Sequence, residues 1–126
     1  MVIAMIIGLA AGLILGFVFN VTYPVQYSFY ITMALLAGMD SVAGALRSYM
    51  QNTYSNLIFA TGFVANAALA GLLTYLGDKL GIPLYYAAIL VFGGRLFNNL
   101  AVCRRIAVDR YLEKKEAKKN ERSGEK

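Results

Sequence analysis

The sequence has 126 residues, of which 59% are hydrophobic, and its formal net charge is +5. A chain of this length fits one domain, but a soluble domain of that size leaves much of its surface in water and is usually about 45–50% apolar. The composition therefore argues against a soluble globular domain. It predicts an all-α integral membrane protein instead.

The first apolar segment covers residues 2–19 and contains no charged side chain. About 18 helical residues approach the thickness of the hydrocarbon core, roughly 30 Å, so we expect a transmembrane helix. A cleaved signal peptide is the competing interpretation. It is disfavoured because no basic residue precedes the segment and residues 20–27 offer no small-x-small cleavage site.

Small residues recur every four positions in this first segment, at Ala4, Gly8, Gly12 and Gly16. On a helix this spacing places them on one stripe, a doubled GxxxG pattern that lets another backbone approach closely. The partner is either another helix of the same chain or the same stripe of a second copy. The motif predicts close packing and leaves both partners open.

Three more apolar segments follow, and we predict helices at about 28–47, 54–76 and 83–103. The second of the four segments contains Asp40 and Arg47, and a buried Asp in a span is costly. The sequence therefore predicts a bundle of four transmembrane helices, or three if the second segment is re-entrant. Short connections at 20–27, 48–53 and 77–82 make neighbouring helices antiparallel.

Residues 1–103 thus form the predicted transmembrane domain, and residues 104–126 form a basic tail. Nine of the twelve Lys and Arg residues and five of the seven acidic residues lie from Arg104 onward, which gives the tail a net charge of +4. By the positive-inside rule the C-terminus is cytoplasmic, and with four spans the N-terminus is too. Anionic lipid headgroups or a protein partner are expected to contact four arginines: Arg47, Arg104, Arg105 and Arg110.

Polar residues interrupt the predicted spans at matching depths. Asp40 and Arg95 each lie twelve residues into segments that run in the same direction, about 18 Å deep by the helical rise, and Asn66 reaches a similar level from the opposite direction. Because either charge alone is costly in the membrane, we expect an Asp40–Arg95 pair. Ser41, Asn66, Asn98 or Asn99 would satisfy the remaining donors and acceptors.

Ordered motifs give the chain a resemblance to the bacterial small basic protein family. The patterns are D-x-x-x-G-x-x-R at Asp40, Gly44 and Arg47, G-F-x-x-N at Gly62, Phe63 and Asn66, G-R-x-F-x-N at Gly94, Arg95, Phe97 and Asn99, and the Arg104-Arg105 pair that opens the tail. The resemblance implies a bacterial plasma-membrane protein whose gene often neighbours cell-division genes, in a family without a defined biochemical role. We expect six glycines to serve in helix packing: Gly8, Gly12, Gly16, Gly44, Gly62 and Gly94.

An enzymatic function is not expected. The sequence has no histidine, a single cysteine (Cys103), no paired catalytic carboxylates within the spans and no phosphate-binding loop, so no metal or other cofactor is predicted. No motif accompanies the tail charge that would indicate nucleic-acid binding. Two functions remain: a homo-oligomeric structural or adaptor unit that serves cell-division or envelope proteins, and a subunit of an oligomeric transporter or channel with a polar path near Asp40, Asn66 and Arg95.

Overall fold

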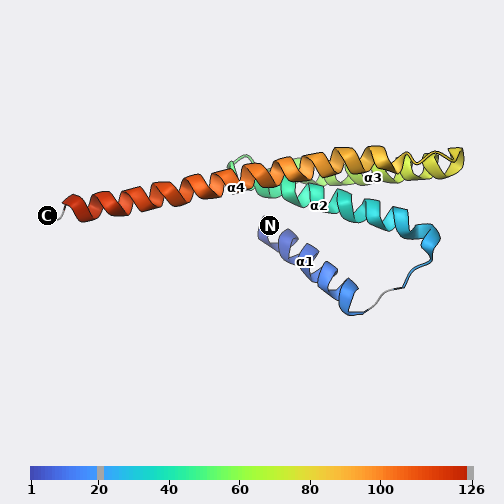
Figure 1. The fold of residues 1–126 in the computed structure, drawn as a ribbon, viewed down its shortest axis with the longest axis horizontal. Coiled ribbons are helices and arrows are strands. Elements are labelled where there is room, and N and C mark those ends of the chain that lie inside the picture. The colour runs from blue at the N-terminus through green and yellow to red at the C-terminus, as the bar shows by residue number, and fades with distance from the viewer. Residues whose placement is uncertain (20–21, 125–126) are drawn as a thin grey trace.

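The protein is all-helical in a computed structural model that describes residues 1–19 and 22–124. Three of the helices in this part of the chain are long and apolar enough to cross a membrane, and the first is shorter. The elements are α1 (Val2–Val18), a 3₁₀ turn η1 (Val25–Tyr27), α2 (Ser28–Met50), α3 (Asn56–Leu80) and α4 (Tyr85–Gly124) (Figure 1).

The last three helices are longer than predicted, and the connections between them lie further along the chain. Residues 48–50 continue α2 and residues 77–80 continue α3, so two predicted loops are partly helical. Ser55 begins α3 by accepting a hydrogen bond from the Ile58 amide, and Gly81 ends it with φ 66°, a left-handed conformation that glycine adopts without strain. Positions 20 and 21 of the first predicted connection lie outside the described residues.

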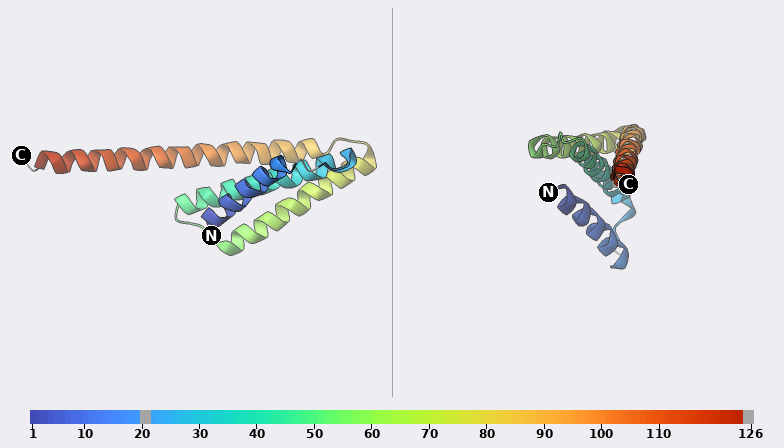
Figure 2. Two further views of the ribbon diagram at one scale, coloured as in Figure 1. Left: turned by 90° about the horizontal axis from the view of Figure 1, so that it is seen from below. Right: turned by 90° about the vertical axis from the view of Figure 1, so that its left-hand side faces the viewer.

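The helix α2 is the centre of the bundle, because α3 and α4 both pack along it whereas they contact each other much less (Figure 2). The segment that the sequence left open as re-entrant is therefore the best-packed helix. A buried apolar core joins the three helices through side chains that are mostly small, which lets the backbones approach closely. Its members are Met33, Ala37, Ala70, Ala88 and Phe92.

The helix α1 stands apart from this bundle. It contacts no described helix except α2, and Figure 1 shows it leaving the bundle at an angle. Its N-terminal part lies near the α2–α3 loop, where the Tyr54 hydroxyl donates a long hydrogen bond of 3.9 Å to the Met5 sulfur. At 17 residues, or about 25 Å by the helical rise, α1 is shorter than the predicted 2–19 span.

The helix α4 runs without a break through the predicted boundary between residues 103 and 104. Its 40 residues correspond to about 60 Å, and its second half extends far beyond the other helices (Figure 1). The predicted tail is thus a continuation of the last bundle helix as far as Gly124. Residues 125 and 126 of the tail lie outside the described part.

Candidate functional site

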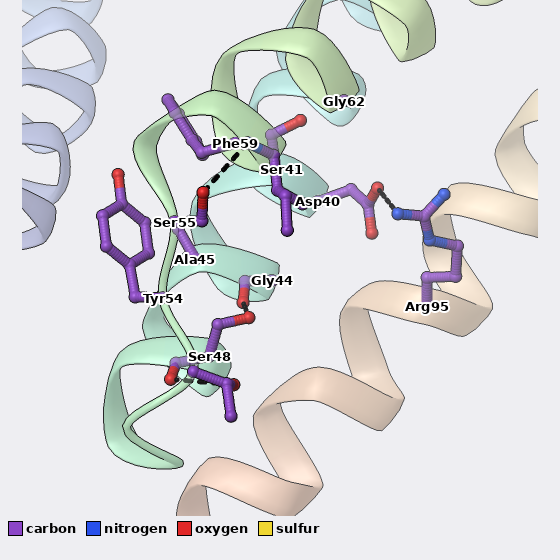
Figure 3. A pocket seen from close by; sticks show the side chains of 12 residues that line it. Asp40, Ser41, Gly44, Ala45, Ser48, Tyr54, Ser55, Phe59, Gly62 and Arg95 are labelled. Atoms are coloured by element: carbon purple, nitrogen blue, oxygen red, sulfur yellow. Dashed lines mark hydrogen bonds and ion pairs between the residues drawn. The ribbon is translucent and has the colours of Figure 1, made fainter.

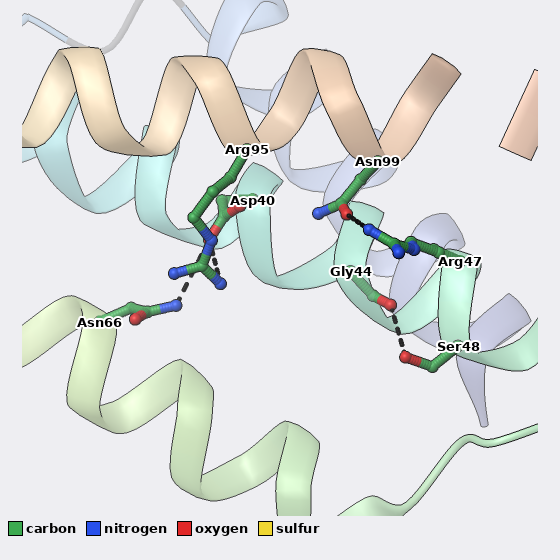
Figure 4. A network of polar contacts seen from close by, with 7 residues as sticks. All are labelled: Asp40, Gly44, Arg47, Ser48, Asn66, Arg95 and Asn99. Carbon is green, nitrogen blue, oxygen red and sulfur yellow. Dashed lines mark hydrogen bonds and ion pairs between the residues drawn. The ribbon is translucent and has the colours of Figure 1, made fainter. Parts of the chain in front are cut away.

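Three polar side chains from three helices meet at one level of the bundle, and we call Asp40, Asn66 and Arg95 the polar cluster. Arg95 of α4 places Nη2 3.1 Å from Asp40 Oδ2, and Asn66 Nδ2 of α3 donates to the same oxygen over 3.3 Å (Figure 4). The predicted pairing of Asp40 with Arg95 is confirmed in the structure. The cluster therefore links α2 to both of its neighbours.

The two charged partners differ in their surroundings. Asp40 is 0% exposed, whereas 52% of the Arg95 side chain is exposed. A long Arg side chain can keep its apolar stem against the helices and its head in a polar layer, but a carboxylate has no such freedom. Asp40 consequently depends on Arg95 more strongly than Arg95 depends on Asp40.

The remaining residues predicted for this cluster lie elsewhere. Asn99 accepts a hydrogen bond from Arg47 Nη1 over 3.2 Å, one helical turn nearer the α2–α3 loop (Figure 4). Arg47, which was expected to contact lipid headgroups or a protein partner, is partly exposed and makes this contact with α4. Asn98 is exposed on the outer side of α4 and Ser41 lines a cavity on the α3 side, so neither completes the cluster. The two short side-chain contacts, at Asp40 and at Arg47, both hold α4 against α2.

A cavity of about 240 Å³ lies beside the polar cluster, between α2, α3 and the loop that joins them (Figure 3). Two of its lining residues have buried oxygens without a hydrogen-bond partner in the described chain, Asp40 Oδ1 and Ser41 Oγ. A buried polar atom without a partner is costly, so a water molecule bound at either oxygen would be stabilising. The hydroxyl-bearing residues that line it are Ser41, Ser48, Thr53, Tyr54 and Ser55.

The cavity reaches the polar cluster from one side and does not continue past it. Its walls on α2 begin at Asp40 and run toward the α2–α3 loop, whereas Met33 and Ala37 on the other side of Asp40 belong to the buried apolar core. The core therefore closes the inner end of the cavity. Within one copy of the chain, the residues that line this cavity do not extend past the polar cluster.

Two polar positions important for the bundle were not singled out from the sequence. Tyr30 donates to Asp78 Oδ2 over 2.8 Å, which ties the start of α2 to the end of α3, and Thr74 is fully buried with its hydroxyl on the Ala70 carbonyl. The Tyr30–Asp78 hydrogen bond could have been predicted from the sequence, because antiparallel α2 and α3 bring the ends that contain these two residues together.

The six predicted packing glycines fall into two groups. Gly44 lies against α4, where an added Cβ would be 3.6 Å from Asn99 Nδ2, and Gly62 lines the cavity. An added Cβ would meet no described atom within 4 Å at Gly62 or at any of the other four positions, so no neighbouring helix of the described chain fills the α1 stripe. The other four positions are Gly8, Gly12, Gly16 and Gly94.

The predicted contact arginines of the tail lie at the α2–α3 end of the bundle. Arg104 and Arg105 are exposed, and Arg110 Nη2 donates to the Met50 carbonyl over 2.6 Å, which caps the end of α2. The described residues contain no group of three or more His, Cys, Asp or Glu side chains placed to hold a metal ion. The site is therefore a polar linkage with a cavity beside it.

Comparison with known proteins places this arrangement in a family. The model of a protein family of unknown function, DUF1290, matches residues 23–108. The small basic protein of Bacillus subtilis (strain 168) is 42% identical over 115 residues, covering 91% of this chain and 95% of its own. Uncharacterised proteins of Mycobacterium tuberculosis and Mycobacterium bovis are 40% identical over 78 residues, or 60% of this chain and 64% of theirs. No solved structure matches.

Proposed function

The chain belongs to the DUF1290 family and is similar to the Bacillus subtilis small basic protein, and from its structure we propose that it is a structural or adaptor unit of the bacterial plasma membrane. In this proposal several copies assemble and present the extension of α4 to a cell-division or envelope protein. The observation that carries the proposal is the continuity of α4, which joins a polar-linked bundle to a projecting basic helix.

The distribution of charge supports an orientation with this extension in the cytoplasm. Arg47 and the tail arginines lie at the α2–α3 end of the bundle, whereas the α3–α4 end has Lys79 beside Asp78. The positive-inside rule assigns the more basic end to the cytoplasm. Because the N-terminal part of α1 lies near the α2–α3 loop, a membrane-crossing α1 would place the N-terminus on the cytoplasmic side as well.

The contacts around α4 support a scaffolding function. Asp40 holds α4 within the apolar region, the Arg47–Asn99 hydrogen bond follows one to two turns later, and Arg110 caps α2 where α4 leaves the bundle. Three successive polar contacts along one helix fix its direction relative to α2. An extension with a fixed direction suits recognition by a partner better than a loosely attached tail.

Localisation of the full chain in living cells tests this proposal. We expect a fluorescent fusion of the wild type to concentrate at division sites, and a charge-reversed variant with Lys114→Glu, Lys115→Glu and Lys118→Glu to spread over the membrane. All three lysines are exposed on the projecting part of α4, so insertion of the bundle should be unaffected. Reversing Glu113, Glu116 and Glu121 to Lys is the matched control. Identical distributions of the wild type and the lysine variant would contradict the proposal.

Transport is the second candidate function, and the cavity is the observation that favours it. Asp40 is among the residues that line the cavity, and intramembrane carboxylates often lie on ion or proton paths. A path through the membrane would then have to run between copies, because the apolar core closes the cavity within one copy. The ion pair between Asp40 and Arg95 favours a structural role for the carboxylate over a role in transport.

Reconstitution in liposomes separates the two functions. We expect vesicles that contain the purified protein to hold gradients of protons, sodium and potassium as well as vesicles without protein. A flux that the wild type supports and Asp40→Asn abolishes would assign the polar cluster to transport and count against the adaptor proposal. Ser41→Ala, which alters the cavity without changing a charge, serves as the control for a nonspecific leak.

A further inference from the structure

The side of α4 that faces away from the bundle has a regular pattern which no described helix covers. Residues at alternating spacings of three and four form one continuous seam along the helix, from the apolar span into the projecting part. Every member is exposed. We call these residues the α4 seam: Val91, Gly94, Asn98, Ala101, Arg105, Val108 and Leu112.

Asn98 is the unusual member within the apolar span. Its amide is exposed and makes no hydrogen bond to any described residue, although the span is apolar enough to lie in a membrane. An amide has both donors and an acceptor, and in lipid it gains substantially by pairing with another polar group. Gly94, one turn earlier, leaves open space where a side chain would stand, so another helix can approach closely there.

The seam continues where α4 has left the bundle. Val108 and Leu112 are 50% and 49% exposed on the projecting helix, between charged residues of the tail. In water, apolar residues at this spacing with charges on both sides are typical of a helix that pairs with another helix. Two separate observations, an unpaired amide in the span and an apolar stripe beyond it, thus lie on one line.

We propose that the α4 seam is the surface through which two copies of this chain pair, with their α4 helices parallel. The proposal rests on the self-association included in the proposed function and names its surface. All copies of a membrane protein have the same orientation, so two α4 helices related by a twofold axis along the membrane normal place identical residues at identical depths. Asn98 of each copy then faces Asn98 of the other.

The spacing fits a parallel two-stranded coiled coil. Val91 and Asn98 occupy equivalent positions seven residues apart, and Gly94 and Ala101 occupy the alternate positions. A single Asn at the first type of position specifies register and favours dimers. Small residues at the second type bring the helices close at the level where Asn98 must reach its counterpart.

Charge complementarity also favours a second copy as the occupant. In a parallel pair with this register, Arg104 of one helix lies opposite Asp109 of the other, five residues further along. Both side chains are exposed on the single chain. Their opposite signs flank the seam at the level where α4 leaves the bundle, so the register that pairs Asn98 in the span also pairs Arg104 with Asp109 outside it.

Disulfide cross-linking in native membranes tests this surface, in a Cys103→Ala background so that each chain has one cysteine. We expect Ala101→Cys and Val108→Cys to give covalent dimers under mild oxidation, because seam residues of a parallel pair come within disulfide reach. Their neighbours Leu100→Cys and Ala107→Cys, also exposed but about 100° around the helix, should give several-fold less. Equal yields at seam and neighbour positions, or none at either, would overturn the proposal.

Asn98→Leu provides the second test, with the particle mass in detergent or nanodiscs as the measurement. Loss of the paired amides should weaken dimerisation about fivefold to tenfold. Asn98→Gln, which can still pair, should retain most of it. Because Asn98 makes no hydrogen bond to a described residue, neither change should affect the bundle itself. An oligomer that persists in Asn98→Leu and forms no seam cross-link would exclude this surface while leaving self-association, and hence the proposed function, intact.

Discussion

The helices α1 and α2 are both apolar, yet they have opposite positions in the molecule. The helix α2 is covered by α3 and α4 along its length and contains six buried residues, whereas α1 touches α2 alone among the described helices and has one. The difference is not one of apolar character, because α1 is the more uniformly apolar of the two. The difference in packing corresponds to the polar side chains: α2 has Asp40, Ser41 and Arg47, and α1 has none.

This contrast has a physical reason. In a membrane, apolar side chains gain little by leaving lipid for another apolar helix, so hydropathy measures compatibility with lipid and not attachment to neighbours. Polar groups and small residues supply the attachment. In α2 the Asp40 carboxylate and the small Ala37 and Gly44 provide both. In α1 only the small residues are present, and they face no described helix.

The first test of this difference between α1 and α2 removes Arg95, the ion-pair partner of Asp40. Arg95→Leu leaves the fully buried Asp40 carboxylate with Asn66 alone, and breaking a buried ion pair from one side costs about 3 kcal/mol. We expect a loss of that size in the free energy of unfolding, measured in mixed detergent micelles. Asp40→Leu should cost less, since the half-exposed Arg95 can reorient toward a polar layer.

The double variant Asp40→Asn/Arg95→Leu controls for side-chain size. Without the buried charge, most of the loss should be recovered, leaving about 1 kcal/mol or less. Leu100→Ala, at an exposed position of the same helix, should have little effect. If the double variant is as unstable as Arg95→Leu alone, the ion pair does not account for the stability of α2.

The second test of the difference between α1 and α2 adds side-chain volume where α2 packs against α4. At Gly44 an added Cβ would already lie 3.6 Å from Asn99 Nδ2, so the further atoms of Gly44→Leu must displace Asn99 and its hydrogen bond to Arg47. Overpacking of this kind costs about 2 kcal/mol. The same unfolding measurement applies, with Gly44→Ala as the control that fits the existing space and should be nearly neutral.

The fold could be predicted from the sequence to the extent that it depends on hydropathy and on depth. Apolar runs indicated four helices, and counting residues from the segment ends placed Asp40, Asn66 and Arg95 at one level, as the structure has them. That agreement arises because the helical rise is fixed, so residue number converts directly into depth.

The direction in which a side chain faces around its helix was harder to predict than its depth. Asn98 and Asn99 are neighbours in the sequence, but a helix turns about 100° per residue, so Asn99 faces α2 and Asn98 faces outward. The central position of α2 and the separation of α1 from the bundle were not predicted from the sequence. The cavity depends on how α2 and α3 separate near their loop, which no local pattern in the sequence encodes.

A smaller effect is expected at Ser41, whose buried hydroxyl has no partner in the described chain. If the cavity were dry, Ser41→Ala would remove an unsatisfied polar group and raise stability by about 1 kcal/mol. With water in the cavity the hydroxyl is already satisfied, and we expect a change within about 0.5 kcal/mol. The unfolding free energy of Ser41→Ala distinguishes these outcomes, with Val42→Ala, at the neighbouring position outside the cavity lining, as the control for a change on α2 that leaves the cavity intact.

The smallest effect on the folded chain is expected on α1, from Gly12→Leu. No described atom would lie within 4 Å of the added Cβ, so the free energy of unfolding of one copy should change by less than about 0.5 kcal/mol, in contrast to Gly44→Leu. The particle mass then decides what the stripe is for. A smaller particle with unchanged unfolding would place Gly8, Gly12 and Gly16 between copies, whereas unchanged mass and unchanged unfolding would leave the stripe facing lipid. Marked destabilisation at constant mass would instead show that α1 packs its stripe onto the bundle, and would end the contrast between α1 and α2.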